Sequence, residues 1–244
     1  MAYSRGERVS AVLASAGPSV YWYLTRSTGA VALLLLTLAL ALGVLDVQRW
    51  SSPRWPRFVV DSLHRSVSLL ALAFLVAHIL TSVLDSFAPI GLLDAFIPFV
   101  GSYRAFWLGL GAVAFDLILA VILTSLLRQR MGYGTWRAVH WLTYASWPIA
   151  LLHGFGTGSD VKSGWLLVLS VACAAIVAAA VVTRVVAGWP QNIGRRSVAL
   201  GSTGAFSLFL ALWLPSGPLG HEWARRSGTP TALLPHSTSV KGKR

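Results

Sequence analysis

Charged residues are scarce in this chain: of its 244 residues, 11% are charged and 55% are hydrophobic. A soluble domain of this length carries about 25% charged residues. Cysteine is scarcer still, because Cys173 is the only one and lies in an apolar run. A single cysteine excludes an intrachain disulfide and the cysteine-rich sites that bind zinc or iron–sulfur clusters. The composition therefore disfavours a soluble or disulfide-stapled domain and indicates a membrane protein.

Five long segments contain no charged residue, and a sixth is interrupted by Asp116 alone. Each is close to the roughly 20 residues that cross the hydrocarbon core of a bilayer as an α-helix. We therefore predict an all-α, polytopic membrane bundle of about six transmembrane helices. The expected helices cover residues 24–46, 62–84, 105–127, 135–155, 164–187 and 197–215.

The apolar segments divide the chain into three regions. We expect an N-terminal tail at residues 1–21, a transmembrane domain at 22–215, and a polar, disordered C-terminal tail at 216–244. A cleaved signal peptide is the alternative for the first helix, because Ala39-Leu40-Ala41 resembles a cleavage site. We favour a retained helix, since a long tail precedes the apolar run and the run itself is long for a signal peptide.

The formal net charge of +12 would first suggest a nucleic-acid partner. The arginines, however, flank the apolar segments, where they act as an orientation signal. We therefore expect the lipid bilayer as the surroundings and no nucleic acid. The first, third and fifth connections hold most of the basic residues, which places them in the cytoplasm and both termini outside, as in a multi-pass protein of a bacterial inner membrane. Arg26, Arg225 and Arg226 count against this orientation.

Four of the six histidines lie inside predicted membrane helices. His64 and His78 stand 14 residues apart on the second helix, and His140 and His153 stand 13 apart on the fourth. These spacings correspond to about 21 Å and about 19–20 Å along a helix axis. Because the second and fourth helices run in the same direction, the first members of the two pairs share one depth and the second members share another. The expected arrangement is two histidine couples stacked across the membrane.

Each couple has the chemistry to hold one haem iron from both faces. A neutral imidazole is a good iron ligand and needs no charge in lipid. Two imidazoles fill both axial positions, so such an iron can only exchange electrons. A zinc site would need three or four ligands at one point, which the predicted depths exclude for these histidines. No C-x-x-C-H motif occurs, so we predict two non-covalently held haem b groups. The alternative is that each histidine only hydrogen-bonds a neighbouring helix.

The spacing of 13 residues on the fourth helix requires an irregularity. At about 100° per residue, a spacing of 14 returns to nearly the same face, whereas 13 misses it by roughly 140°. Pro148 lies between the two histidines and leaves the carbonyl of Tyr144 without its helical donor. We therefore predict a kink or a tightened turn at residues 144–148.

The histidine pattern resembles the ferric-reductase-type transmembrane domain, the membrane core of NADPH oxidases, ferric-chelate reductases and the haem subunit of a bacterial methionine sulfoxide reductase. The resemblance covers roughly residues 22–187. It implies that His64 and His140 ligate an inner haem, and that His78 and His153 ligate an outer one. It also implies transmembrane electron transfer through a cytochrome b-like core.

Fused members of that family carry a cytoplasmic flavin and nicotinamide domain, and no βαβ pattern follows the last predicted helix here. We therefore expect an oxidoreductase component whose donor is a separate flavin- and NAD(P)H-dependent reductase or a quinol. The resemblance implies an extracytoplasmic acceptor: ferric iron, a flavoprotein or a reductase subunit. The glycines from Gly154 to Gly158 follow no strand, so we interpret them as a helix end rather than a nucleotide loop.

Two arginines adjoin the inner couple in sequence. Arg65 follows His64 directly, and Arg137 lies one turn before His140. Arginine pairs with carboxylates through two parallel hydrogen bonds, which suits the propionates of a haem. The alternative is that both arginines only set the orientation of the helices. Asp116 is either a proton relay, a partner of Arg104 or of a histidine, or a residue facing a water pocket.

Two other functions compete with a dihaem electron conduit. A proton-coupled transporter with relaying histidines would line a path with polar residues, and apart from Asp116 the helices have few. A quinol-linked cytochrome b subunit shares the haems and differs only in its electron donor.

Overall fold

The computed structural model describes residues 19–48, 56–158, 161–187 and 189–234, and in these ranges every regular element is helical. Residues 1–18 of the predicted N-terminal tail lie outside the described residues. Five helices are long and apolar enough to cross a membrane. These are α2 (Val20–Val47), α3 (Arg57–Leu84), α4 (Ala105–Leu126), α7 (Gly164–Val186) and α8 (Ile193–Ser216). The all-α, polytopic bundle predicted from the sequence is confirmed.

The fourth predicted helix is divided in two, α5 (Tyr133–His140) and α6 (Thr143–Thr157). Between them the backbone forms a tightened turn with hydrogen bonds to the residue three positions back. Leu142 N donates to Val139 O at 2.9 Å, and Ala145 N donates to Leu142 O at 3.0 Å. The irregularity predicted between the two histidines is present, but it is centred at 141–142 rather than at 144–148. Pro148 itself lies inside α6.

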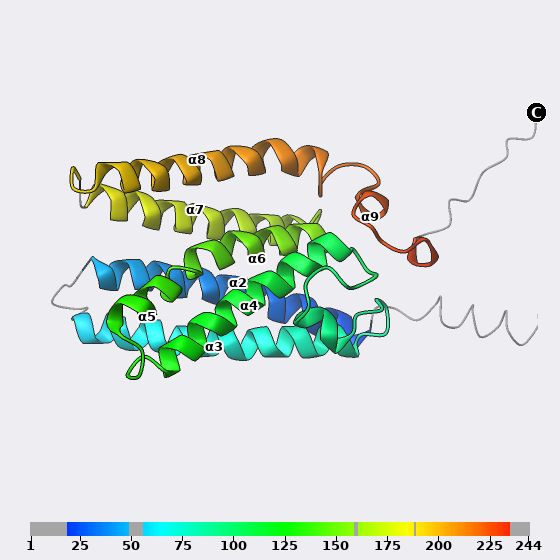
Figure 1. The fold of residues 1–244 in the computed structure, drawn as a ribbon. Coiled ribbons are helices and arrows are strands. Elements are labelled where there is room, and N and C mark those ends of the chain that lie inside the picture. The colour runs from blue at the N-terminus through cyan, green and yellow to red at the C-terminus, as the bar shows by residue number, and fades with distance from the viewer. Residues whose placement is uncertain (1–18, 49–55, 159–160, 188, 235–244) are drawn as a thin grey trace, which may run out of the picture.

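The helices α2 and α3 run antiparallel and pack against each other along their lengths (Figure 1). The Ser19 side chain caps α2 by accepting from Trp22 N at 3.0 Å. Its hydroxyl also donates to Asp85 Oδ1 at 2.9 Å, which ties the start of α2 to the residue that ends α3. Ala39-Leu40-Ala41 lies in the middle of α2, within a continuous helix.

The remaining helices complete the bundle around α2. Figure 1 shows α7 and α8 side by side above α6 and α2, and α4 packs on α6. A buried core forms between α6, α7 and α8. One of its members, Trp147, donates through Nε1 to Thr37 Oγ1 on α2 at 2.9 Å. This core is made of Trp147, Leu151, Phe155, Val161, Cys173 and Leu210.

The beginning of the C-terminal tail, which we expected to be disordered, is folded as far as Leu234. It contains α9 (Trp223–Arg226) and the short helix η2 (Thr231–Leu233). This segment packs against Arg104, which is only 3% exposed and donates to Thr229 Oγ1 at 2.9 Å. The segment thus supplies one acceptor to a buried guanidinium, and its Gly228 O accepts from Arg104 N at 3.1 Å. Residues 235–244 lie outside the described residues.

Candidate functional site

The four membrane histidines form two couples at opposite ends of α3. The ring centres of His64 and His140 are 6.4 Å apart with planes at 74°, and those of His78 and His153 are 6.3 Å apart at 81°. We call the first the inner couple and the second the outer couple. In each, one histidine comes from α3 and the other from the α5–α6 segment, so the turn at 141–142 allows both histidines of that segment to face α3.

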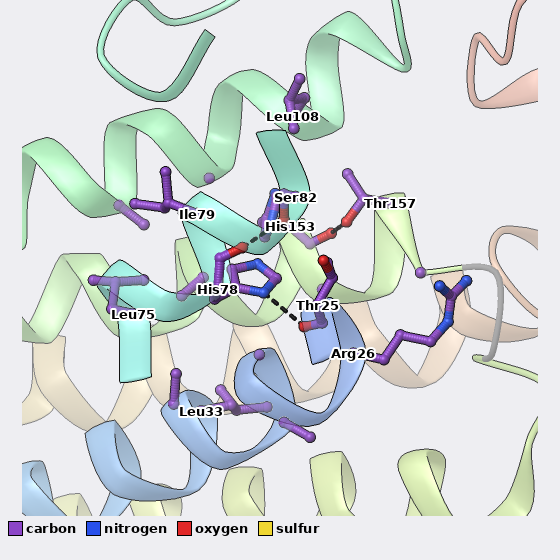
Figure 2. Close-up of a pocket in the computed structure, with 18 of the residues that line it drawn as sticks. Thr25, Arg26, Leu33, Leu75, His78, Ile79, Ser82, Leu108, His153 and Thr157 are labelled. Atoms are coloured by element: carbon purple, nitrogen blue, oxygen red, sulfur yellow. Dashed lines mark hydrogen bonds between the residues drawn. The ribbon is translucent and has the colours of Figure 1, made fainter. Parts of the chain in front are cut away.

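The outer couple is held by two backbone carbonyls. His78 Nδ1 lies 2.8 Å from Thr25 O on α2 (Figure 2), and His153 Nδ1 lies 2.9 Å from Trp107 O on α4. A carbonyl can only accept a hydrogen bond, so each Nδ1 carries the proton. In the neutral ring this leaves the lone pair on Nε2, on roughly the opposite side of the ring from the carbonyl. Such anchoring is the usual way in which a protein fixes the tautomer of a ligating histidine.

The inner couple is anchored on one side. His64 Nδ1 lies 2.9 Å from Ala39 O, which repeats the pattern of the outer couple. His140 Nδ1 is buried and has no hydrogen-bond partner in the described part of the chain. His140 ends α5, where its ring stacks on Trp136 with the ring centres 5.0 Å apart. The inner couple therefore has one histidine of fixed tautomer and one held by stacking.

Three of the histidine rings lie against glycines. A Cβ placed on Gly29 would be 2.9 Å from the nearest atoms of His78, and one on Gly43 would be 3.2 Å from His64. The same substitution at Gly111 would bring a carbon within 2.5 Å of His153. A Cβ contact below 3.0 Å essentially never occurs, so the rings at Gly29 and Gly111 occupy space that only glycine leaves open.

These glycines share one local rule that the sequence analysis missed. Each glycine stands four residues after the residue whose backbone carbonyl anchors the same histidine ring. Thr25 precedes Gly29, Ala39 precedes Gly43, and Trp107 precedes Gly111 in this way. In an α-helix, residues i and i+4 share one face, so one histidine ring contacts both the carbonyl and the glycine. Gly29 and Gly43 stand 14 residues apart, as do His64 and His78. This equal spacing on two antiparallel helices was the signal available in the sequence.

A cavity of about 270 Å³ opens beside the outer couple, and both His78 and His153 line it. Its walls are mostly apolar, and Figure 2 labels Leu33, Leu75, Ile79 and Leu108 among the lining side chains. Arg26 and Tyr103 also line this cavity and were not singled out from the sequence.

The geometry of each couple fits a metal held between two imidazoles. With a metal–nitrogen bond of about 2.0–2.1 Å, as for imidazole on zinc, and a ring centre about 1.2 Å behind the ligating atom, the ring centres would be about 6.4 Å apart. The observed 6.3 and 6.4 Å agree with this separation. In the described ranges no group of three or more His, Cys, Asp or Glu side chains could hold a metal alone. The remaining ligands would then come from a cofactor such as a porphyrin.

The described contacts of the other residues singled out from the sequence involve none of the four membrane histidines. Arg65 is exposed and pairs with Asp61 at 3.0 Å. The Arg137 side chain is exposed and lines a second cavity, formed with α7 and α8. In the described part of the chain, Asp116 forms no ion pair with Arg104 or with a histidine.

Residues 28–151 match the family model described as "Ferric reductase like transmembrane component". This range is just over half of the chain and contains three of the four membrane histidines; His153 lies two residues beyond it. The chain belongs to this family. No curated protein and no solved structure matches the chain. Membership supports a multi-pass membrane protein with a reductase-type role in transmembrane electron transfer, in a family that generally binds haem.

Proposed function

We propose that this chain carries electrons across the membrane through two haem b groups, one held by His64 and His140 and the other by His78 and His153. The observation that supports this most directly is the matched ring separation of 6.4 and 6.3 Å in two couples at different depths. Two haems, when bound, would supply one-electron carriers near both faces of the bilayer.

The surroundings of the histidines also support the assignment. Three rings donate Nδ1–H to backbone carbonyls, which leaves Nε2 available as a ligand. Glycines leave room for the rings, and an apolar cavity adjoins the outer couple. A histidine that only bridged two helices would also donate to a carbonyl, but it would need neither a glycine beside its ring nor a facing imidazole with its ring centre about 6.4 Å away.

We propose that electrons move from the cytoplasmic side outward. The inner couple lies toward the ends of the helices that the arginine-rich first and third connections join, and positive-inside places these connections in the cytoplasm. Because the cytoplasm is electrically negative, a full outward crossing of one electron is favoured by about 2.3 kcal/mol per 100 mV.

We propose that the chain is one component of an oxidoreductase, with redox partners on either side. The donor would be a separate flavin- and NAD(P)H-dependent reductase or a quinol. The acceptor would be ferric iron, a flavoprotein or a reductase subunit outside the cytoplasm. Haem reduction in membrane vesicles distinguishes the two donors. Reduction of the haems by a quinol analogue without added reductase favours a quinol donor. Reduction only when a flavin reductase is added favours a protein donor.

The central experiment is a reduced-minus-oxidised spectrum of the purified chain with haem quantified per polypeptide. We expect two low-spin, bis-histidine haems per chain. A chain expressed with haem available that shows no such spectrum contradicts the proposal.

A further inference from the structure

A second cavity of about 910 Å³ lies between α6, α7 and α8, apart from the outer couple. Its deeper walls are apolar side chains from these helices, among them Pro148, Val177, Val181 and Phe206. Figure 1 shows α8 at the edge of the bundle, beside α7. The cavity is therefore bounded by a helix that packs on the bundle mainly through one neighbour.

One end of this cavity is strongly basic. Arg184 and Arg195 line it, together with two aromatic rings. The Arg195 guanidinium lies 5.2 Å from the centre of the Trp141 ring, and that of Arg184 lies 5.9 Å from Trp141 and 6.0 Å from Tyr144. Aromatic faces hold both cations toward the same space.

These two arginines have no acidic partner. In the described part of the chain, neither Arg184 nor Arg195 forms a salt bridge, and Arg184 Nη1 is buried without a hydrogen-bond partner. Among the described residues, no aspartate, glutamate or histidine lines the cavity. A buried guanidinium nitrogen without a partner is costly, so this end of the cavity is suited to an anion.

By contrast, a third arginine at this end, Arg196, has backbone acceptors for its guanidinium. Arg196 Nη1 donates to Arg184 O at 3.1 Å and also to Val185 O, and Arg196 Nε donates to Gln191 O. Arg196 therefore ties the end of α7 to the start of α8. Arg184 and Arg195 have no comparable structural role in the described contacts, which leaves their donors for a ligand.

We propose that this cavity binds an anionic glycerophospholipid, with its phosphate between Arg184 and Arg195 and an acyl chain along the apolar walls. Arginine binds phosphate oxygens in a two-pronged geometry. Basic pockets between transmembrane helices on the cytoplasmic side recognise anionic headgroups, and positive-inside places this end of α7 and α8 there. The phosphate accounts for the basic end and the acyl chain for the apolar depth.

Two other occupants fit less well. A small soluble phosphate would leave the large apolar part of the cavity unfilled. A quinol releases protons as it is oxidised, and none of the described residues that line the cavity has a carboxylate or imidazole to accept them. The charge and the apolar depth together favour an anionic lipid. Its presence would support α8 beside the α5–α6 turn, independently of how many haems the chain binds.

The test uses the full chain purified in a neutral detergent. Native mass spectrometry and thermal unfolding are recorded with phosphatidylglycerol, with phosphatidylcholine of the same chains, and with inorganic phosphate alone. We expect one phosphatidylglycerol per chain to bind saturably and raise the unfolding midpoint, with little effect from the other two. Arg184→Gln with Arg195→Gln should weaken this binding by about tenfold or more, as lost charge-assisted hydrogen bonds would.

Two further variants sharpen the result. Arg130→Gln removes an exposed arginine on the same expected side of the membrane and should leave phosphatidylglycerol binding unchanged. Ala178→Leu puts a larger side chain into the apolar part of the cavity while keeping both arginines, and it should also weaken phosphatidylglycerol binding. Equal binding of the two lipids, or equal affinity in the double variant and in Arg130→Gln, overturns the proposal. Stabilisation by inorganic phosphate as strong as by the lipid also overturns it and indicates a soluble phosphate ligand.

Discussion

The imidazole of His153 lies directly against Gly111, where a single added methyl group would come within 2.5 Å of the ring. The same ring is anchored by Trp107 O, one helical turn earlier on α4. The position of His153 is thus set by two features of one short stretch of α4, a carbonyl that accepts from the ring and the absence of a side chain.

Gly111→Ala should therefore disturb the outer couple. A glycine-to-alanine change in a helix interior normally stabilises by about 0.5–1 kcal/mol. At Gly111 we expect the opposite sign and a loss of haem toward one per chain, because the His153 ring must move. The haem-to-protein ratio and the unfolding midpoint measure both effects.

The matched control for this change is Gly201→Ala on α8. A Cβ at Gly201 would meet nothing within 4 Å, so the haem ratio should be unchanged. Full haem content in Gly111→Ala would show that the space beside His153 is not needed for the ligand.

The inner couple should be the more reactive of the two. His140 Nδ1 lacks the carbonyl partner that the other three rings have, and loss of such a partner typically costs 10–100-fold in metal affinity. We expect carbon monoxide to displace a ligand in one reduced haem component only. That component should be the one that His140→Ala removes; reaction of the component assigned to His78 and His153 would contradict this.

Arg65 and Arg137 remain our predicted partners of the inner propionates. Arg65 forms an exposed ion pair with Asp61, and an exposed pair of this kind contributes only about 0–1 kcal/mol to stability. Replacing both arginines with Gln should lower haem occupancy of the inner site or shift its midpoint potential. Normal haem content and potential in the double variant would leave the arginines with an orienting role alone.

Arg104 should be a stability determinant of the outer end. Its guanidinium donates to Gly156 O and Thr157 O at 3.0 Å as well as to Thr229, and burial lowers the pKa of this group. Arg104→Gln removes these charge-assisted bonds, worth about 1.5–3 kcal/mol each, and should lower the unfolding midpoint. The exposed Arg130→Gln is the control, and equal midpoints in the two variants would contradict the assignment.

The spans and the histidine couples could be predicted because they depend on simple periodicities. A hydrocarbon core requires long uncharged helices, and helices of known rise place His64 and His78 at fixed depths. The conflict between a spacing of 13 and a straight helix also indicated an irregularity, and the structure has one.

The remaining features depend on tertiary contacts. The turn formed at Trp141 and Leu142, whereas Pro148 lies inside α6. The C-terminal segment is held by distant contacts: Trp223 of α9 donates to Gly156 O, and Arg104 donates to Thr229 Oγ1, 125 residues later in the chain. Gly111 gave no signal by itself, since its role depends on a ring brought from another helix.

The most direct test of the account is the haem content of four single variants, in which each membrane histidine is replaced by alanine. We predict that the wild-type chain holds two haems, that His64→Ala and His140→Ala remove the same spectral component, and that His78→Ala and His153→Ala remove the other. Loss of different components by His64→Ala and His140→Ala, or a wild-type chain without a bis-histidine haem, would contradict the central claim.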